Sequence, residues 1–183
     1  MSFSRATSVI LGPVILGLSA VPLVAVGIAA TGIAPAAIGV GYLAVVTPWL
    51  VLTDAREHRL PNRLVLPGIA AGLVSVAGEW ALGGLPPLAP LVAGPCYAGF
   101  LLLLNRIGGM GMGDVKLGGA LGLSSWLPAI GVLSPVIAFL AGGLVAAVLL
   151  VLGRRGRRIA FGPYLLGGFW AATALVAGNR LLG

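Results

Sequence analysis

Apolar residues occur along this chain in long runs, and polar residues are confined to the short gaps between them. Most runs approach or exceed the roughly 20 residues that a helix needs to cross the hydrocarbon core of a bilayer. Seven segments can be read, at approximately 8–30, 37–53, 64–83, 88–106, 114–124, 127–152 and 163–181. The fifth is short, and a Ser-Ser-Trp-Leu-Pro stretch separates it from the sixth. We therefore expect an all-α fold, a polytopic transmembrane helical bundle of six or seven spans.

Composition agrees with a membrane environment. Hydrophobic residues make up 59% of the 183 positions and charged residues 8%, against roughly 25% charged residues in soluble domains. The mean hydropathy is +1.11. Because the chain shows no internal repeat and no linker, we expect one integral-membrane domain over residues 1–183. The first segment is longer than the apolar region of a signal peptide, so we expect an uncleaved span.

Positive charges fall in alternate gaps between the segments. The 11 Lys and Arg residues outnumber the 4 acidic residues, which gives a net charge of +7. Ten of the 11 lie on one side of the predicted topology: Arg5, Arg56, Arg59, Arg63, Arg106, Lys116, Arg154, Arg155, Arg157 and Arg158. This asymmetry predicts a multi-pass protein of the inner (plasma) membrane with that side in the cytoplasm. The charges form no continuous basic surface, so we expect no nucleic-acid partner; the cluster at 154–158 is a candidate contact for membrane lipid.

Two of the few acidic residues stand at this same membrane edge. Asp54 ends the second segment and Asp114 begins the fifth. A carboxylate at the edge of the hydrocarbon is costly to desolvate, so its presence needs a reason. Two neighbouring carboxyl groups cannot both ionise cheaply, which leaves one charged and one protonated. Such a pair suggests acid/base chemistry that needs no bound group, so we expect no cofactor; with only Cys96 as a thiol, we also expect no metal site.

Three motifs lie at this edge of the predicted bundle. The first, at 53–63, contains Asp54 and a Pro61-Asn62 turn; the second, at 108–117, contains Gly111-Met112-Gly113-Asp114-Val115-Lys116-Leu117; the third contains Phe161-Gly162-Pro163. Together they resemble the type IV prepilin peptidase (prepilin leader peptidase) family of intramembrane Gly-x-Gly-Asp aspartyl proteases. The resemblance covers most of the chain from about residue 40 onward.

This resemblance implies an aspartic endopeptidase that removes the leader peptide of type IV prepilins or pseudopilins at the cytoplasmic membrane face. Asp54 and Asp114 match the two catalytic residues of the family. The remaining motif residues are candidates for the active-site loops and for substrate binding: Pro61, Asn62, Gly111, Gly113, Lys116, Phe161, Gly162 and Pro163. Family members that also methylate their product carry paired Cys-x-x-Cys motifs in an N-terminal domain. This chain has one cysteine, so we expect no such zinc/methyltransferase domain and no methyl transfer.

Helix ends suggest separate roles for the two acids. Asp114 opens a helix, where free N–H groups favour the anion, whereas Asp54 closes one, where the dipole favours the protonated form. We therefore hypothesise that Asp114 is the base and Asp54 the acid. Asn62 is a candidate helix cap, and His58, in a polar loop, is expected to be solvated and not catalytic.

Two other readings of the same residues remain open. An archaeal-type preflagellin peptidase shares the mechanism, although the Pro-Asn and Phe-Gly-Pro features favour the bacterial prepilin type. A small non-enzymatic membrane transporter would use the two acids as ion ligands, but both lie at one edge and not at mid-membrane. Presenilin-like proteases pair Tyr-Asp with Gly-x-Gly-Asp, whereas Thr53 precedes Asp54 here.

Overall fold

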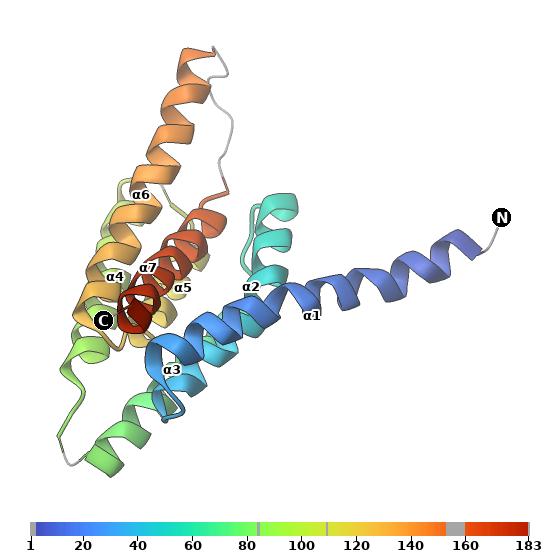
Figure 1. Ribbon diagram of the computed structural model, residues 1–183. Coiled ribbons are helices and arrows are strands. Elements are labelled where there is room, and N and C mark those ends of the chain that lie inside the picture. Colours follow the sequence, from blue (N-terminus) through green and yellow to red (C-terminus); the bar gives the residue numbers. More distant parts are fainter. Residues whose placement is uncertain (1–2, 84, 109, 153–159, 183) are drawn as a thin grey trace.

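The computed structural model describes residues 3–83, 85–108, 110–152 and 160–182, and its secondary structure over these ranges is entirely helical (Figure 1). Seven helices follow one another along the described chain: α1 (Phe3–Thr31), α2 (Ala36–Glu57), α3 (Asn62–Gly83), α4 (Leu88–Arg106), α5 (Met112–Leu123), α6 (Pro128–Val151) and α7 (Gly162–Leu182). Each corresponds to one of the seven apolar segments. The predicted all-α bundle is therefore confirmed, and the break between the fifth and sixth segments is real.

Five of these helices are long and apolar enough to cross a membrane: α2, α3, α4, α6 and α7. In α1 the stretch Gly17–Thr31 forms a shorter apolar helix within the residues searched. Helix α5 is different, because its 12 residues reach only about 18 Å against a hydrocarbon core of about 30 Å. The chain is thus a multi-pass helical membrane protein in which α5 does not span the bilayer by itself.

Helix α5 lies in the interior of the bundle. Its residues from Leu117 to Leu123 are all buried, and it packs mainly against α4 and α3. Glycines allow this close approach: a Cβ atom at Gly122 would lie 2.6 Å from the Cα of Gly94 in α4, and one at Gly72 in α3 would lie 2.8 Å from the Cβ of Leu123. Small residues at helix contacts let backbones approach in this way.

The long helices pair unequally. Helix α4 packs chiefly on α5, and α6 packs chiefly on α7, whereas α4 and α6 touch each other over far fewer residues. The C-terminal end of α2 and the N-terminal ends of α5 and α7 meet at one end of the bundle. Exposed Arg56, Arg59, Arg63 and Arg106 lie in or beside the connections at that end. The predicted lipid-contacting arginines at 154–158 lie outside the described residues.

Candidate active site

Asp54 and Asp114, which are 60 positions apart in the sequence, line the same cavity. This cavity has a volume of about 230 Å³. Its walls come from the end of α2, the connection to α3 and the start of α5, through Asp54, His58, Arg59, Leu60, Gly111, Met112, Gly113 and Asp114. The fold therefore brings together the two carboxyl groups that the sequence placed at the same membrane edge.

Asp54 lies in the last turn of α2 and is only 4% exposed. Its Oδ2 accepts a hydrogen bond of 2.9 Å from the backbone N–H of Gly162, the first residue of α7. A Cβ atom at position 162 would lie 2.7 Å from this oxygen, so only glycine leaves room for the contact. The third predicted motif therefore touches the first through its backbone, and it fixes the orientation of the Asp54 carboxyl group.

Asp114 lies in the first turn of α5 and is 9% exposed. Its Oδ2 accepts a hydrogen bond of 3.2 Å from the N–H of Gly111, and its own N–H donates to the Gly111 carbonyl at 3.1 Å. This reciprocal pair caps the helix start. Two of the glycines in the second motif have a local role here, because Gly111 supplies the extended cap residue and Gly113 packs against Leu60.

The surroundings of Asp114 favour its protonated form. Burial raises the pKa of its carboxyl group from the ordinary 3.8 to about 6, and the negative charge of Asp54 adds to this rise; the N–H of Gly111 opposes it. Desolvation of a carboxylate acts in this direction. We had expected the helix start to favour the Asp114 anion; the pKa of this group shifts in the opposite direction, because loss of water outweighs the single N–H that the side chain receives.

Two polar residues that we did not assign to the site also line the cavity. His58 follows α2 in the left-handed conformation, with φ of 53°, and its N–H donates to the Asp54 carbonyl at 2.9 Å. This turn directs His58 and Arg59 back over the cavity. Both side chains are exposed at its mouth. The sequence places both residues just beyond the helix end that carries Asp54, which could have suggested that they lie near the site. A polar loop alone, however, does not show in which direction the chain turns.

The predicted loop residues divide into two groups. Gly111 and Gly113 line the cavity, whereas Lys116 and Asn62 do not. Instead, Lys116 Nζ donates to Asn62 Oδ1 at 3.0 Å, which joins α5 to α3. Asn62 is itself the first residue of α3, and the first amides of that helix bond to the Pro61 carbonyl. The expectation that Asn62 caps the helix is therefore wrong, because its side chain bonds to Lys116.

The Phe-Gly-Pro motif reaches the acids through Gly162 alone. The ring of Phe161 packs 5.0 Å from that of Phe139 in α6 and 5.9 Å from that of Tyr164 in α7, between ring centroids. Phe161 also lies against Gly142, where a Cβ atom would approach its ring to 2.6 Å. Neither Phe161 nor Pro163 lines the cavity. The motif thus holds the start of α7 against α6 so that the Gly162 N–H faces Asp54.

Comparison with known proteins matches the type IV leader peptidase family to residues 41–152. The chain is 38% identical over 131 residues to a "Prepilin leader peptidase/N-methyltransferase" of Neisseria gonorrhoeae, which covers 66% of this chain and 43% of that protein. A protein of the same name from Aeromonas salmonicida (strain A449) is 33% identical over 147 residues, or 70% of this chain and 47% of its own. The chain spans less than half the length of these curated relatives. No solved structure matches it significantly.

The matched region contains both carboxyl groups of the cavity, the glycines that shape it and five of the seven helices in whole or in large part. It also covers more than half of the chain. On this ground the protein belongs to the type IV leader peptidase family.

Proposed function

We propose that this chain is an intramembrane aspartyl endopeptidase that cleaves the leader peptide of type IV prepilins or pseudopilins. One observation carries the proposal: Asp54 and Asp114, from separate helices, line one cavity in a member of the type IV leader peptidase family. Two relatives are named prepilin leader peptidases. The substrate would present a peptide bond between the acids, with its leader on the charged side and its apolar helix in the membrane.

Hydrolysis needs one ionised and one protonated carboxyl group. The ionised group takes a proton from water as the water oxygen attacks the carbonyl carbon, and the protonated group donates its proton to the carbonyl oxygen. The tetrahedral intermediate is a gem-diol. As it collapses, the leaving nitrogen takes the water-derived proton from one carboxyl group, the C–N bond breaks, and a hydroxyl of the gem-diol returns its proton to the other carboxylate. The products are a carboxylic acid and an amine, and the enzyme regains its single shared proton. The cavity volume of about 230 Å³ has room for water beside a backbone segment.

The surroundings of the acids support one division of roles within this proposal. Asp114 acts as the acid, because its pKa is raised to about 6 by burial and by the charge of Asp54. Asp54 acts as the base, because the Gly162 N–H donates to its carboxylate oxygen over 2.9 Å. This reverses the assignment that helix ends alone suggested. The pair shares its proton, so a measured pKa belongs to both groups.

We further propose that the cavity faces the cytoplasm across the inner (plasma) membrane. The exposed arginines of the described chain that lie near the cavity, Arg56, Arg59, Arg63 and Arg106, support this orientation. Positive residues in short loops remain on the cytoplasmic side during insertion. A basic surface at this edge also attracts anionic lipid headgroups.

The direct test is co-expression of the chain with candidate prepilins from its own genome, followed by mass measurement of the pilin. We expect a loss of mass that equals the leader. Asp54→Asn and Asp114→Asn should each abolish this loss, whereas Glu57→Gln should retain it, because Glu57 is an exposed carboxylate one turn from Asp54 that does not line the cavity. Wild-type cleavage by either Asn variant would disprove the two-aspartate mechanism.

A further inference from the structure

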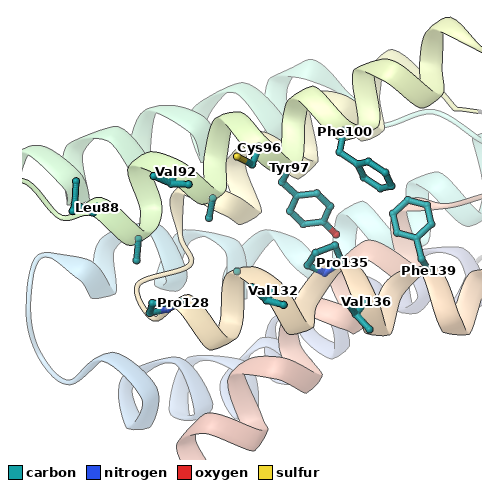
Figure 2. Close-up of a pocket in the computed structure, with 13 residues that line it drawn as sticks. Leu88, Val92, Cys96, Tyr97, Phe100, Pro128, Val132, Pro135, Val136 and Phe139 are labelled. Atoms are coloured by element: carbon teal, nitrogen blue, oxygen red, sulfur yellow. The ribbon is translucent and has the colours of Figure 1, made fainter.

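A second and larger cavity lies between α4 and α6, away from the two aspartates. Its volume is about 730 Å³, and it extends from Leu88 to Phe100 along α4 and from Pro128 to Phe139 along α6 (Figure 2). The cavity exists because α4 is held by α5 and α6 by α7, so the two helices diverge. Its lining is almost wholly apolar, and Val92 and Val132 at its rim are 58% and 63% exposed. This apolar surface is accessible from the membrane.

An aromatic chain connects this cavity with the aspartate site. Phe100 and Phe139, which line the cavity, have ring centroids 5.2 Å apart, and Phe139 lies 5.0 Å from Phe161. Phe161 precedes Gly162, whose N–H binds Asp54. The Phe100 end of the cavity is therefore connected to Asp54 through the rings of Phe139 and Phe161 and then through the backbone of Gly162.

The cavity runs from this end toward the opposite side of the membrane. Helix α4 ends at Arg106, next to the connection into α5, so Phe100 lies nearer the aspartates and Leu88 lies farther away. Phe100 is 12 positions after Leu88, a rise of about 18 Å along the helix. A substrate that is cut at the aspartates and continues as an apolar helix into the membrane would run in this same direction.

A buried hydroxyl group distinguishes this cavity from a simple lipid-filled gap. Tyr97 lines it, is 4% exposed and has no hydrogen-bond partner for its hydroxyl among the described residues. Its ring reaches from α4 toward Pro135 of α6 (Figure 2). The hydroxyl of Ser134, at 0% exposure, lies within reach of the Tyr97 hydroxyl, although neither makes a hydrogen bond of regular geometry there. A hydroxyl at the wall of an apolar cavity gains nothing from an acyl chain, whereas a polar side chain of a docked helix can bond to the Tyr97 hydroxyl.

We propose that the α4/α6 cavity is the docking site for the apolar helix that follows the scissile bond in the substrate. This inference rests on the proposed function and adds where the uncut part of the substrate binds. The helix would pack against Val92 and Val132, present a polar side chain to Tyr97, and place the cleavage site beside Asp54 and Asp114.

The first test fills the cavity. Val132→Trp places an indole at its rim, and Leu140→Trp is the matched control, since Leu140 is 69% exposed on the same helix but does not line the cavity. Two substrates are compared: a full-length prepilin that the wild-type chain cuts, and a soluble peptide that spans the same cleavage site without the apolar helix. We expect Val132→Trp to lower kcat/KM for the full-length substrate by about tenfold or more relative to Leu140→Trp. Cleavage of the short peptide should stay unchanged, which also shows that the variant is folded.

The second test uses Cys96, which is exposed, lines the cavity and is the single cysteine of the chain. Single cysteines are placed along the apolar helix of the prepilin, and each is oxidised with the Asp54→Asn/Asp114→Asn double variant. We expect disulfides with substrate positions three to four residues apart, and none with Cys96→Ser added to the double variant. Disulfides only between two copies of the chain would assign the cavity to a second copy and overturn the proposal.

Other outcomes separate this inference from the proposed function. If both Trp variants cut both substrates like the wild type, or if no substrate cysteine reacts, the docking site is disproved while the peptidase remains. If Val132→Trp lowers cleavage of both substrates equally, the cavity serves the site without holding the substrate helix, and the docking inference fails. If the wild-type chain cuts neither substrate, the proposed function itself fails.

Discussion

Gly162 donates its backbone N–H to Asp54 Oδ2 over 2.9 Å, although the two residues are 108 positions apart. This contact joins the start of α7 to the end of α2. Glycine has no substitute at position 162, because a Cβ atom there would meet the carboxylate oxygen at 2.7 Å. The glycine of the Phe-Gly-Pro motif is therefore required because any side chain at position 162 would collide with the Asp54 carboxyl group.

Gly162→Ala should displace the Asp54 carboxyl group and lower prepilin cleavage by about 100-fold, because catalytic groups tolerate displacements of well under 1 Å. Gly167→Ala is the matched control in the same helix, since nothing lies within 4 Å of a Cβ atom there. Cleavage rates of the purified variants, with thermal unfolding measured in parallel, check this. Equal rates in the two variants would show that the Gly162 contact does not position the acid.

Asp114 should show a raised pKa that depends on Asp54. The raised value of about 6 has burial as its main cause and the charge of Asp54 as its second. In Asp54→Asn the charge is gone, so the pKa of Asp114 should fall but remain above 3.8. Infrared titration of the carboxyl stretch with isotope-labelled aspartate measures this directly. An unchanged pKa would mean that the two groups do not interact.

The same shift predicts how stability depends on pH. The folded state holds the Asp114 proton more tightly than the unfolded chain does, because the pKa is raised from 3.8 to about 6. The free energy of unfolding therefore falls as pH rises from about 4 to about 6. Above that range both states have lost the proton, and the free energy of unfolding falls no further through this residue. Asp114→Asn removes the effect. We therefore expect the variant to gain melting temperature relative to the wild type between pH 4 and pH 7. A constant difference across this range would contradict the assignment of a raised pKa.

The Lys116–Asn62 hydrogen bond should matter little for stability. It spans 3.0 Å and is exposed, and such contacts contribute about 1 kcal/mol or less. Lys116→Ala and Asn62→Ala should each cost about this amount, and the double variant should cost no more than either alone. Cleavage should change only a few-fold. Loss of cleavage in Lys116→Ala, with normal cleavage in Asn62→Ala, would instead assign Lys116 a direct role with the substrate.

Close packing of α5 on α4 should be sensitive to a single methyl group. Gly122→Ala would force the α5 backbone away from Gly94 and destabilise the protein by about 1–3 kcal/mol. Gly143→Ala in α6 has open space around it and should be neutral or slightly stabilising. Thermal unfolding in detergent compares them. Equal melting temperatures would show that α4 and α5 separate more easily than their contacts indicate.

Helix positions were predictable because each follows from a long apolar run, and the seven segments agree with the seven helices to within a few residues. The meeting of Asp54 and Asp114 at one edge was predictable from the alternation of charged gaps. Their catalytic role stays a prediction. The raised pKa of Asp114 was not predictable, because it depends on burial of the side chain, and local sequence shows only that a helix begins nearby.

Contacts between distant residues were the other part that sequence reasoning missed. Sequence reasoning missed the Lys116–Asn62 bond, the Gly162–Asp54 bond and the placement of His58 and Arg59 over the cavity. These depend on how four helix ends meet, the end of α2 and the starts of α3, α5 and α7. A motif identifies the residues, but the partner of each is set by packing over more than 50 positions in the first two cases.

The shortness of α5 has a consequence for biogenesis. Nine buried residues in succession, Leu117–Ser125, leave this segment almost no surface for contact with lipid, and Asp114 and Val115 before them are buried too. Ser125 Oγ closes the far end by donating to the Leu121 carbonyl at 2.9 Å. Partition from the translocon rewards apolar surface that reaches lipid across the full membrane thickness. Helix α5 offers neither, so we expect it to enter the membrane only after its longer neighbours have assembled, and the cavity that holds Asp54 and Asp114 to form after them.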